Sequence, residues 1–193
     1  NLFAHTFPQQ GIEVRFADPR DPASFGKLID AKTKAVFIES IGNPLGNVTD
    51  IRALADVAHA HGVPLIVDNT VPSPYLLRPI EFGADIVVHS LTKYLGGHGT
   101  SVGGAIVDSG KFPWAAHKER FKRLNEPDVS YHGVVYTEAL GEAAYIGRAR
   151  VVPLRDPAAN SSVFRWKVAA SFATVAAVAA LGWNLLGTVN APQ

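Results

Sequence analysis

The sequence predicts an α/β fold in which a mostly parallel sheet of short strands lies between two layers of helices. Short apolar runs of strand length alternate with segments of helical periodicity between residues 13 and 107, which is the order that builds parallel β–α–β units. The runs are nearly continuously apolar, as is typical of strands buried on both faces. In such sheets, ligands bind beyond the carboxyl ends of the strands.

The composition is that of a folded domain. The 193 residues are 47% hydrophobic and 18% charged, and 18 Lys and Arg against 17 Asp and Glu leave a net charge of +1. This balance gives no basic field that would favour nucleic acid as a partner. The absence of Cys excludes disulfides, thiolate metal sites and cysteine nucleophiles. With no Met and with Asn1 as its first residue, the chain is expected to be a piece of a larger protein.

The first elements follow in order along the chain. Glu13–Ala17 alternates apolar and charged residues and predicts a short strand. Asp21, followed by proline, predicts a helix N-terminus, with the helix running to about Ala31. Ala35–Glu39 is a short apolar run and predicts a buried strand. Gly42–Asn47 is a loop by composition.

The next helix is predicted from its cap and its apolar face. Thr49 is expected to cap it, and Gly62 is expected to end it. Its buried face is formed by residues at helical spacing, namely Ile51, Leu54, Ala55 and Ala58. Three further strands are expected beyond it, with a helical turn at Pro79–Gly83 between the first two. These strands are Pro64–Val67, Asp85–His89 and Val102–Val107.

Polar residues gather where three of these strands end, at Glu39-Ser40, Asp68-Asn69-Thr70 and Ser90–Lys93. Hydroxyls and free backbone N–H groups suit a phosphate, and an amine held beside them can form an imine with an aldehyde. A carboxylate at the end of a buried strand is costly unless it has a positive partner. A surface turn and a turn-forming aspartate are the structural alternatives for these residues.

The three strand ends lie in longer motif segments, namely Glu39–Pro44, Val67–Thr70 and His89–Tyr94. In their order and spacing, these segments resemble the Cys/Met-metabolism family of pyridoxal-phosphate enzymes. The resemblance runs from residue 1 to about residue 156. Further stretches are similar to the O-acetylhomoserine sulfhydrylase branch of the family, namely Gly97–Gly104, Lys111-Phe112 and Pro127–Gly133. The fold implied is the large domain of fold type I, which is aspartate-aminotransferase-like.

The resemblance implies a role for five residues, with pyridoxal 5'-phosphate as the cofactor. Lys93 would bind the cofactor aldehyde as a Schiff base and then act as the catalytic proton shuttle. Asp68 would pair with the ring nitrogen, and Asn43 would bond the ring 3-oxygen. Ser90 and Thr92 would donate hydroxyl hydrogen bonds to the phosphate.

The implied reaction is γ-replacement on O-acetyl-L-homoserine by sulfide or a thiol in sulfur amino-acid biosynthesis, by a cytoplasmic homo-oligomer. Three alternatives remain. The chain could have a sister activity (cystathionine γ-synthase, or cystathionine or methionine γ-lyase), it could be a catalytically incompetent fragment of such an enzyme, or it could bind a different phosphate ligand. Family features are missing on either side of the match: a phosphate-binding turn, an aromatic residue that stacks on the ring, an N-terminal arm and the small domain. We therefore expect little turnover from these residues alone.

Two features of the sequence are not explained by the family resemblance. A zinc site of Asp85, His89 and His98 is conceivable, although His89 at the end of an apolar strand fits a packed core histidine better. Residues 157–193 form a divergent apolar tail beyond the expected domain of residues 1–156, with no charged residue after Lys167. Its run of 19 residues, Val168–Leu186, has the length of a membrane span. A buried helix or unrelated sequence joined by a frameshift or fusion are the alternatives, and a membrane partner is not favoured.

Overall fold

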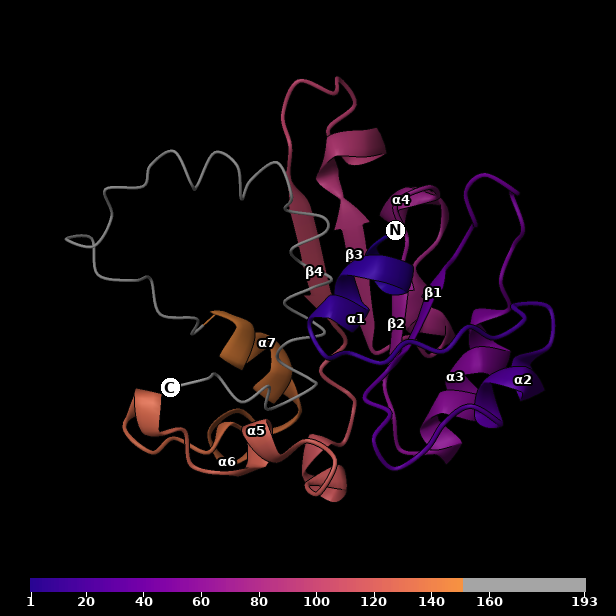
Figure 1. The fold of residues 1–193 in the computed structure, drawn as a ribbon. Helices are drawn as coiled ribbons and strands as arrows, with labels where there is room; N and C mark the ends of the chain where they lie inside the picture. The colour runs from indigo at the N-terminus through magenta and orange to yellow at the C-terminus, as the bar shows by residue number, and fades with distance from the viewer. Residues whose placement is uncertain (151–193) are drawn as a thin grey trace.

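The computed structural model describes residues 1–150, which form a four-stranded sheet with helices on both faces (Figure 1). The strands are β1 (Val36–Glu39), β2 (Leu65–Asp68), β3 (Ile86–Ser90) and β4 (Gly104–Asp108). The helices are α1 (Phe7–Gln9), α2 (Pro22–Gly26), α3 (Ile51–Ala60), α4 (Ser73–Leu76), α5 (Lys122–Asn125), α6 (Tyr136–Leu140) and α7 (Ala144–Arg150). Single helical turns span Leu2–Thr6, Pro79–Phe82, Leu91–Leu95, Trp114–His117, Val129–Tyr131 and Gly141–Ala143.

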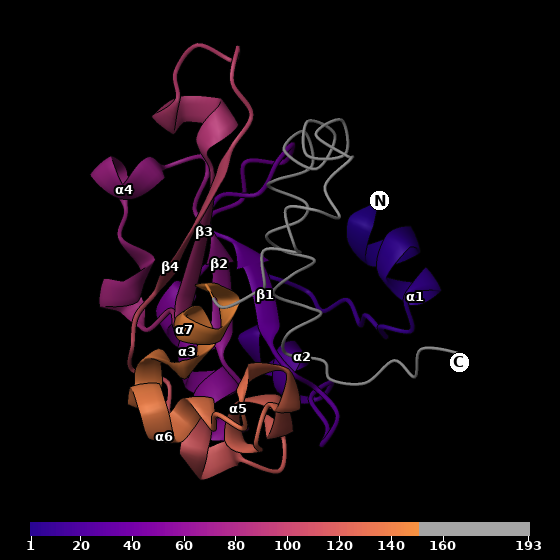
Figure 2. The same ribbon diagram turned by 90° about the vertical axis from the view of Figure 1, so that its left-hand side faces the viewer.

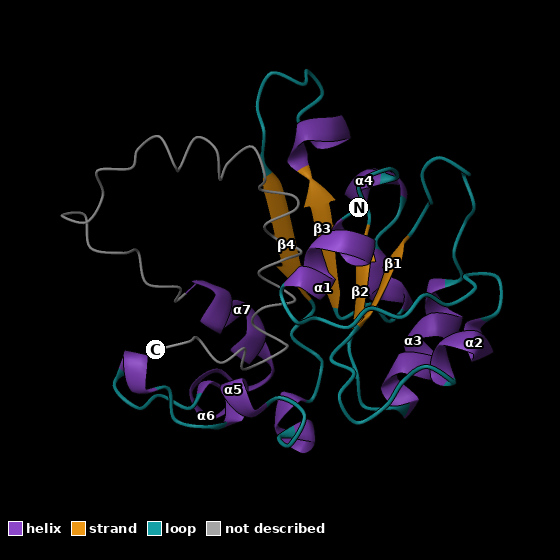
Figure 3. Cartoon of the chain, viewed as in Figure 1, coloured by secondary structure: helices purple, strands orange, loops and turns teal. Residues whose placement is uncertain are grey.

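The sheet confirms the predicted α/β class. β1, β2 and β3 are parallel neighbours in that order, and β4 pairs antiparallel with β3 (Figure 3). Each of these strands lies within two residues of its predicted bounds. The carboxyl ends of the three parallel strands therefore meet at one edge of the sheet, where the polar residues were expected to gather.

Successive side chains of each strand enter two separate cores, because they alternate between the faces of the sheet. Ile86 and Val88 belong to the core on one face, together with Trp114 and Tyr145. Val87 belongs to the core on the other face, which α3 covers with its four predicted apolar residues. In Figure 2, where the sheet is seen from the β4 edge, α1 and α4 lie on opposite sides of it. Both faces are thus covered, as the continuous apolar runs predicted.

The cap of α3 differs from the prediction. The carboxylate of Asp50, rather than the hydroxyl of Thr49, accepts the N–H of Ala53 at 3.0 Å. Thr49 instead donates its hydroxyl to the carbonyl of Glu39 at 2.8 Å. Both residue types cap helices well, and the nearby strand carbonyl decides between them. The helix ends as predicted, since Gly62 follows it with a φ of +66°.

The helix that begins at Asp21 is shorter than expected. Asp21 caps α2 as predicted, accepting the N–H of Ala23 at 3.0 Å, but α2 ends at Gly26 instead of near Ala31. Directly after Gly26, the N–H groups of Leu28 and Ile29 donate to the carbonyls three residues before them, so the α-helical bonding pattern does not continue. Asp30 then forms a separate turn, because its carboxylate accepts the backbone N–H groups of both Lys32 and Thr33.

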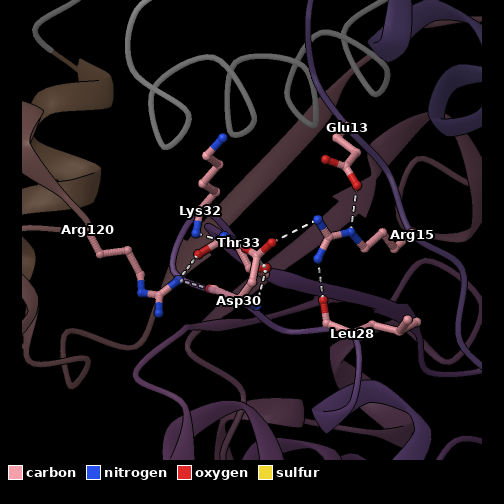
Figure 4. Close-up of polar contacts among 7 residues, drawn as sticks. All are labelled: Glu13, Arg15, Leu28, Asp30, Lys32, Thr33 and Arg120. Atoms are coloured by element: carbon pink, nitrogen blue, oxygen red, sulfur yellow. Dashed lines mark hydrogen bonds and ion pairs between the residues drawn. The ribbon is translucent and has the colours of Figure 1, made fainter.

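The predicted strand at Glu13–Ala17 is wrong, since this segment is a loop that pairs with no described strand. Side-chain contacts hold it instead (Figure 4). The Arg15 guanidinium bonds Glu13 at 2.6 Å, Asp30 at 2.8 Å and the carbonyl of Leu28 at 2.8 Å. Apolar alternation produces a strand only where the segment pairs with a neighbouring strand, and among the described residues Glu13–Ala17 does not pair with β1, the edge strand of the sheet.

Two expectations concern the end of the chain. The boundary near residue 156 and the tail of residues 157–193, including the apolar run Val168–Leu186, lie outside the described residues. Within residues 1–150, no helix has the length and apolar character needed to cross a membrane.

Candidate active site

The ends of β1, β2 and β3 place three polar side chains on one face of the sheet. Glu39 and Asp68 are register partners at the ends of β1 and β2, so their side chains point the same way. Ser90 ends β3 and shares its face with Val88, which is the register partner of Asp68. The structure therefore brings together residues that are 29 and 22 positions apart in sequence.

Asp68 has one oxygen engaged and one oxygen available. Its Oδ1 accepts the backbone N–H of Thr70 at 2.9 Å. Within residues 1–150, no donor bonds its Oδ2, and the side chain is only half-buried. A carboxylate in this state retains capacity for a cationic N–H donor.

Ser90 is the last residue of β3 and Thr92 follows the strand, and both are hydrogen-bonded to neighbouring segments. The backbone N–H of Ser90 donates to the hydroxyl of Thr70 at 2.8 Å. Ser90 itself is buried, with 6% exposure. The hydroxyl of Thr92 donates to the carbonyl of Gly103 at 3.3 Å and accepts the N–H of the same residue at 3.1 Å. To donate a hydrogen bond to a phosphate, the Thr92 hydroxyl must therefore turn its proton away from the Gly103 carbonyl.

Lys93 lies in the middle of the turn Leu91–Leu95, in the loop region beyond β3. Its φ of −90° and ψ of −123° are not helical, so the turn is interrupted at this residue. The side chain is exposed, and among the described residues no hydrogen bond or ion pair involves its ammonium group. The amine is therefore accessible at the same edge of the sheet as Asp68 and Ser90.

Asn43 is placed by Glu39. The Glu39 carboxylate accepts the backbone N–H of Asn43 at 3.0 Å, and the loop is closed by a bond from Gly42 N–H to the Asn47 carbonyl at 2.9 Å. The side chain of Asn43 is exposed. The register of β1 with β2 shows that the Glu39 side chain faces the same side of the sheet as Asp68.

A buried polar layer lies directly behind these residues. The hydroxyl of Ser40 donates to Oδ1 of Asn69 at 2.9 Å, and the Asn69 amide donates to the carbonyls of Ser73 at 3.2 Å and Leu77 at 2.7 Å. Asn69 has 0% exposure. This network joins β1, β2 and α4, and it fixes the backbone that carries Asp68.

His89 belongs to that buried layer and not to a metal site. It is 5% exposed, and burial lowers its pKa, which favours the neutral imidazole. Asp85 lies at the other end of β3, and His98 bonds Thr100 at 2.7 Å. Residues 1–150 hold no group of three metal-ligating side chains, so the conceivable zinc site of Asp85, His89 and His98 is not assembled.

The donor set fits the cofactor that the resemblance implies. Pyridoxal phosphate needs an anionic partner for a cationic ring nitrogen, hydroxyl and backbone donors for its phosphate, and an amine for its aldehyde. The free Oδ2 of Asp68, the hydroxyl of Ser90 and the exposed amine of Lys93 supply one group of each kind at one edge of the sheet.

Two residues of the site were not assigned roles from sequence. Thr70 contacts both Asp68 and Ser90, and Glu39 anchors the Asn43 loop. An aspartate followed two residues later by a residue whose N–H it accepts is a common turn, and the Asp68-Asn69-Thr70 segment has that spacing. No comparable local signal exists for Glu39, whose role depends on its register with β2.

The comparisons agree with this geometry. A family model for Cys/Met metabolism PLP-dependent enzymes matches residues 1–152. The chain is 53% identical over 165 residues to a homocysteine synthase of Schizosaccharomyces pombe, covering 85% of this chain and 38% of the relative. It is 49% identical over 177 residues to an O-acetyl-L-homoserine sulfhydrylase of Leptospira meyeri, covering 87% and 40%. The chain thus spans about two fifths of the length of these curated relatives.

Solved structures show the same relationship. A Campylobacter jejuni protein assigned as an O-acetylhomoserine (thiol)-lyase superposes with a TM-score of 0.72 at 40% identity, over 80% of this chain and 38% of that one. That structure contains N'-pyridoxyl-lysine-5'-monophosphate. The O-acetylhomoserine sulfhydrylase of Wolinella succinogenes superposes with a TM-score of 0.64 at 40% identity, over 78% and 39% of the two chains.

Proposed function

The chain belongs to the Cys/Met metabolism family of PLP-dependent enzymes, and from that premise we propose that it carries the cofactor-binding face of an O-acetylhomoserine sulfhydrylase. One observation supports the proposal above all others. A continuous series of contacts runs across the ends of three parallel strands, from Asn43 through Glu39, Asp68 and Thr70 to Ser90. It joins three of the residues for which the family resemblance implies a role.

Pyridoxal phosphate, when bound, supplies a conjugated ring that accepts the electron pair left behind when a proton leaves the substrate carbon. The chain's part is to hold that ring and to move the protons. Asp68 Oδ2 would accept a hydrogen bond from the ring N–H and keep it protonated, since a carboxylate favours the charged form of its partner. The Lys93 amine would attach the cofactor and afterwards accept and return protons at the substrate.

The remaining contacts of the cofactor would come from the loops around these two residues. The Ser90 hydroxyl and, once its proton turns away from Gly103, the Thr92 hydroxyl would donate to the phosphate. The Asn43 side chain would donate to the ring oxygen, and the Glu39 carboxylate would hold its backbone in place. These roles use each residue in the chemistry that its side chain provides.

The reaction that we propose is a replacement at the γ-carbon. Acetate leaves Cγ of O-acetyl-L-homoserine, and sulfide or a small thiol forms a bond to the same carbon, which gives homocysteine or methionine. Protons must leave both Cα and Cβ before acetate departs. The long, flexible side chain of Lys93 suits a base that must reach two neighbouring carbons.

We propose that the intact protein is a homo-oligomer. Large apolar side chains are exposed in the segments that follow the parallel strands. They include Leu45 at 87% exposure, Val48 at 78%, Tyr75 at 93%, Leu76 at 75% and Tyr94 at 69%. Exposed large apolar side chains in the segments at this end of the sheet support the proposal, because a partner chain can cover such side chains.

Covalent capture of the cofactor tests the proposal. We expect the purified chain, mixed with pyridoxal phosphate, to develop the visible absorbance of lysine-bound cofactor. Borohydride reduction and peptide mapping should then locate the label at Lys93. Lys93→Ala should lose the band and the label, because no amine remains at that position. Lys118→Ala, which removes a lysine far along the chain from this edge, serves as the matched control and should keep both.

A folded wild-type chain with no label at Lys93 would contradict the proposed cofactor site. Substrate choice is measured separately, by homocysteine formation from O-acetylhomoserine and sulfide, with cystathionine and methionine as competing substrates. Preference for cystathionine or methionine would replace the sulfhydrylase assignment by one of the sister activities. Cofactor binding without turnover of any of them would leave the chain a cofactor binder only.

A further inference from the structure

Thr70 contacts two residues that belong to different strands of the sheet. Its backbone N–H donates to Oδ1 of Asp68 at 2.9 Å, and its side-chain Oγ1 accepts the N–H of Ser90 at 2.8 Å. Asp68 is the last residue of β2, and Ser90 is the last residue of β3. One half-buried residue therefore holds both the carboxylate proposed for the ring nitrogen and the residue proposed for the phosphate.

The bond to Ser90 continues the strand pairing beyond the point where the backbone supplies it. Val88 is the last β3 residue in register with β2, and it is paired with Asp68. Ser90 lies two residues further on, where β2 has already ended. The hydroxyl of Thr70 takes the place that a β2 carbonyl would occupy, so on this side the start of the turn that carries Lys93 is held by a side chain. On its other side, Ser90 stays in register with Gly104 of β4, and the Leu91 N–H donates to the Gly103 carbonyl at 2.9 Å.

The bond to Asp68 fixes the direction of its free oxygen. A carboxylate that accepts a backbone N–H through Oδ1 has its rotation about the Cβ–Cγ bond restricted, so Oδ2 points in one direction. Any change in the position of Thr70 is thereby transmitted to Asp68 and to Ser90 together.

We propose that Thr70 is a positioning residue that sets the separation between the Asp68 carboxylate and the Ser90 turn, so that one ligand with a cationic ring and a phosphate contacts both. The inference rests on the proposed function and deepens it. Thr70 acts through Asp68 and Ser90, and its hydroxyl is the part of the residue that carries the link between the strands.

Two substitutions separate the hydroxyl from the rest of the residue. Thr70→Val keeps the shape and the backbone N–H to Asp68 but removes the acceptor for Ser90. Thr70→Ser keeps the acceptor and removes a methyl group. We expect Thr70→Val to weaken the binding of pyridoxal phosphate about tenfold, because the Ser90 N–H loses its partner. Thr70→Ser should stay within about twofold of wild type, because its hydroxyl restores the bond.

Three measurements on the 193-residue chain provide the test. Absorbance titration with pyridoxal phosphate gives the affinity, and the pH dependence of the bound cofactor's visible band reports the pairing of Asp68 with the ring. Hydrogen exchange of the Ser90 amide, measured without cofactor, reports the Thr70 bond directly. Thr70→Val should accelerate this exchange and shift the pH dependence of the band, whereas Thr70→Ser should change neither. A role confined to stability would leave the band unchanged.

The outcomes are distinguishable. Wild-type affinity in Thr70→Val, or equal losses in the valine and serine variants, would overturn the inference while the proposed function stands. No binding of pyridoxal phosphate by folded wild type would overturn the proposed function and this inference with it. Thr70→Ala also removes the hydroxyl, and it repeats the test if the valine variant does not fold.

Discussion

Two aspartates at opposite ends of the sheet differ in how many hydrogen bonds their carboxylates accept from neighbouring groups. Asp85 precedes β3 and is 4% exposed, and its Oδ2 accepts the N–H of Leu65 and contacts His59 Nε2, both at 2.8 Å. Asp68 ends β2 and is half-buried, and its carboxylate accepts one bond within residues 1–150, from Thr70. Burial raises the pKa of Asp85, against the opposing effect of His59 and the Leu65 N–H.

This difference separates a carboxylate with a structural role from the one for which we propose a role in cofactor binding. Buried polar groups cost free energy unless they are hydrogen-bonded, and the partners of Asp85 meet that requirement within the fold. Asp68 retains an oxygen that no described donor bonds, at the edge where ligands bind in parallel sheets. The aspartate at the amino end of the sheet is therefore satisfied by the fold, whereas the one at the carboxyl end keeps an acceptor for the ligand that we propose.

The largest effect is expected from Asp85→Ala, on stability. The substitution leaves the buried N–H of Leu65 without its partner and removes the contact with His59. We expect it to lower the free energy of unfolding by about 2–3 kcal/mol. Asp68→Ala should cost less than about 1 kcal/mol, since its carboxylate is half-buried and holds one bond. Urea unfolding followed by circular dichroism measures both values.

Asp85→Asn is the matched control for this comparison, because it keeps the volume and an acceptor oxygen. It should lower the free energy of unfolding by less than Asp85→Ala does. Equal losses for Asp85→Ala and Asp68→Ala would show that the two ends of the sheet do not differ in the proposed way.

The second-largest effect is expected on cofactor affinity, where the substitution of Asp68 should matter more than that of Asp85. Asp68→Asn replaces the carboxylate by a neutral amide of the same shape, which cannot form a charged pair with the ring nitrogen. We expect it to weaken the binding of pyridoxal phosphate about tenfold, or about 1.4 kcal/mol. Asp85→Asn should change the affinity less than about twofold, because Asp85 lies at the opposite end of the sheet. Absorbance titration gives both values, and an unchanged affinity in Asp68→Asn would remove Asp68 from the site.

Much of this arrangement could be predicted from local pattern. The apolar runs located the strands, the spacing of Ile51 and Leu54 located the buried face of α3, and the rule for parallel sheets pointed to the strand ends. The predicted strand at Glu13–Ala17 failed because alternation within a segment does not say whether a neighbouring strand is present.

What local pattern could not supply is contact between segments far apart in sequence. The choice of Asp50 over Thr49 as the cap of α3 depends on the carbonyl of Glu39, which lies ten residues away from Thr49. The bond between Thr70 and Ser90 depends on the register of β2 with β3. Hydrogen bonds of this kind become visible only once strands are aligned.

The smallest effect is expected in the pH dependence of stability, where a surface carboxylate is contrasted with Asp85. The hydrogen-bonded Arg15 guanidinium lowers the pKa of Asp30 to about 2 (Figure 4). The ionised form is thus favoured by folding, and the stability that Asp30 contributes is present above its unfolded pKa of about 3.9 and lost as the pH falls toward 2. Burial of Asp85 acts in the opposite direction, because a raised pKa favours the protonated form in the folded state.

The difference in unfolding free energy between wild type and variant should therefore change with pH in opposite directions for Asp30→Asn and Asp85→Asn. Urea unfolding between about pH 2 and pH 7 measures this difference for each variant. Wild type should lose stability relative to Asp30→Asn as the pH falls below about 4, because only wild type must protonate a paired carboxylate. Relative to Asp85→Asn, wild type should lose stability as the pH rises above about 4, because only wild type must then ionise a buried carboxyl group. Slopes of the same sign would mean that the surroundings of Asp85 stabilise its charge as fully as Arg15 stabilises that of Asp30.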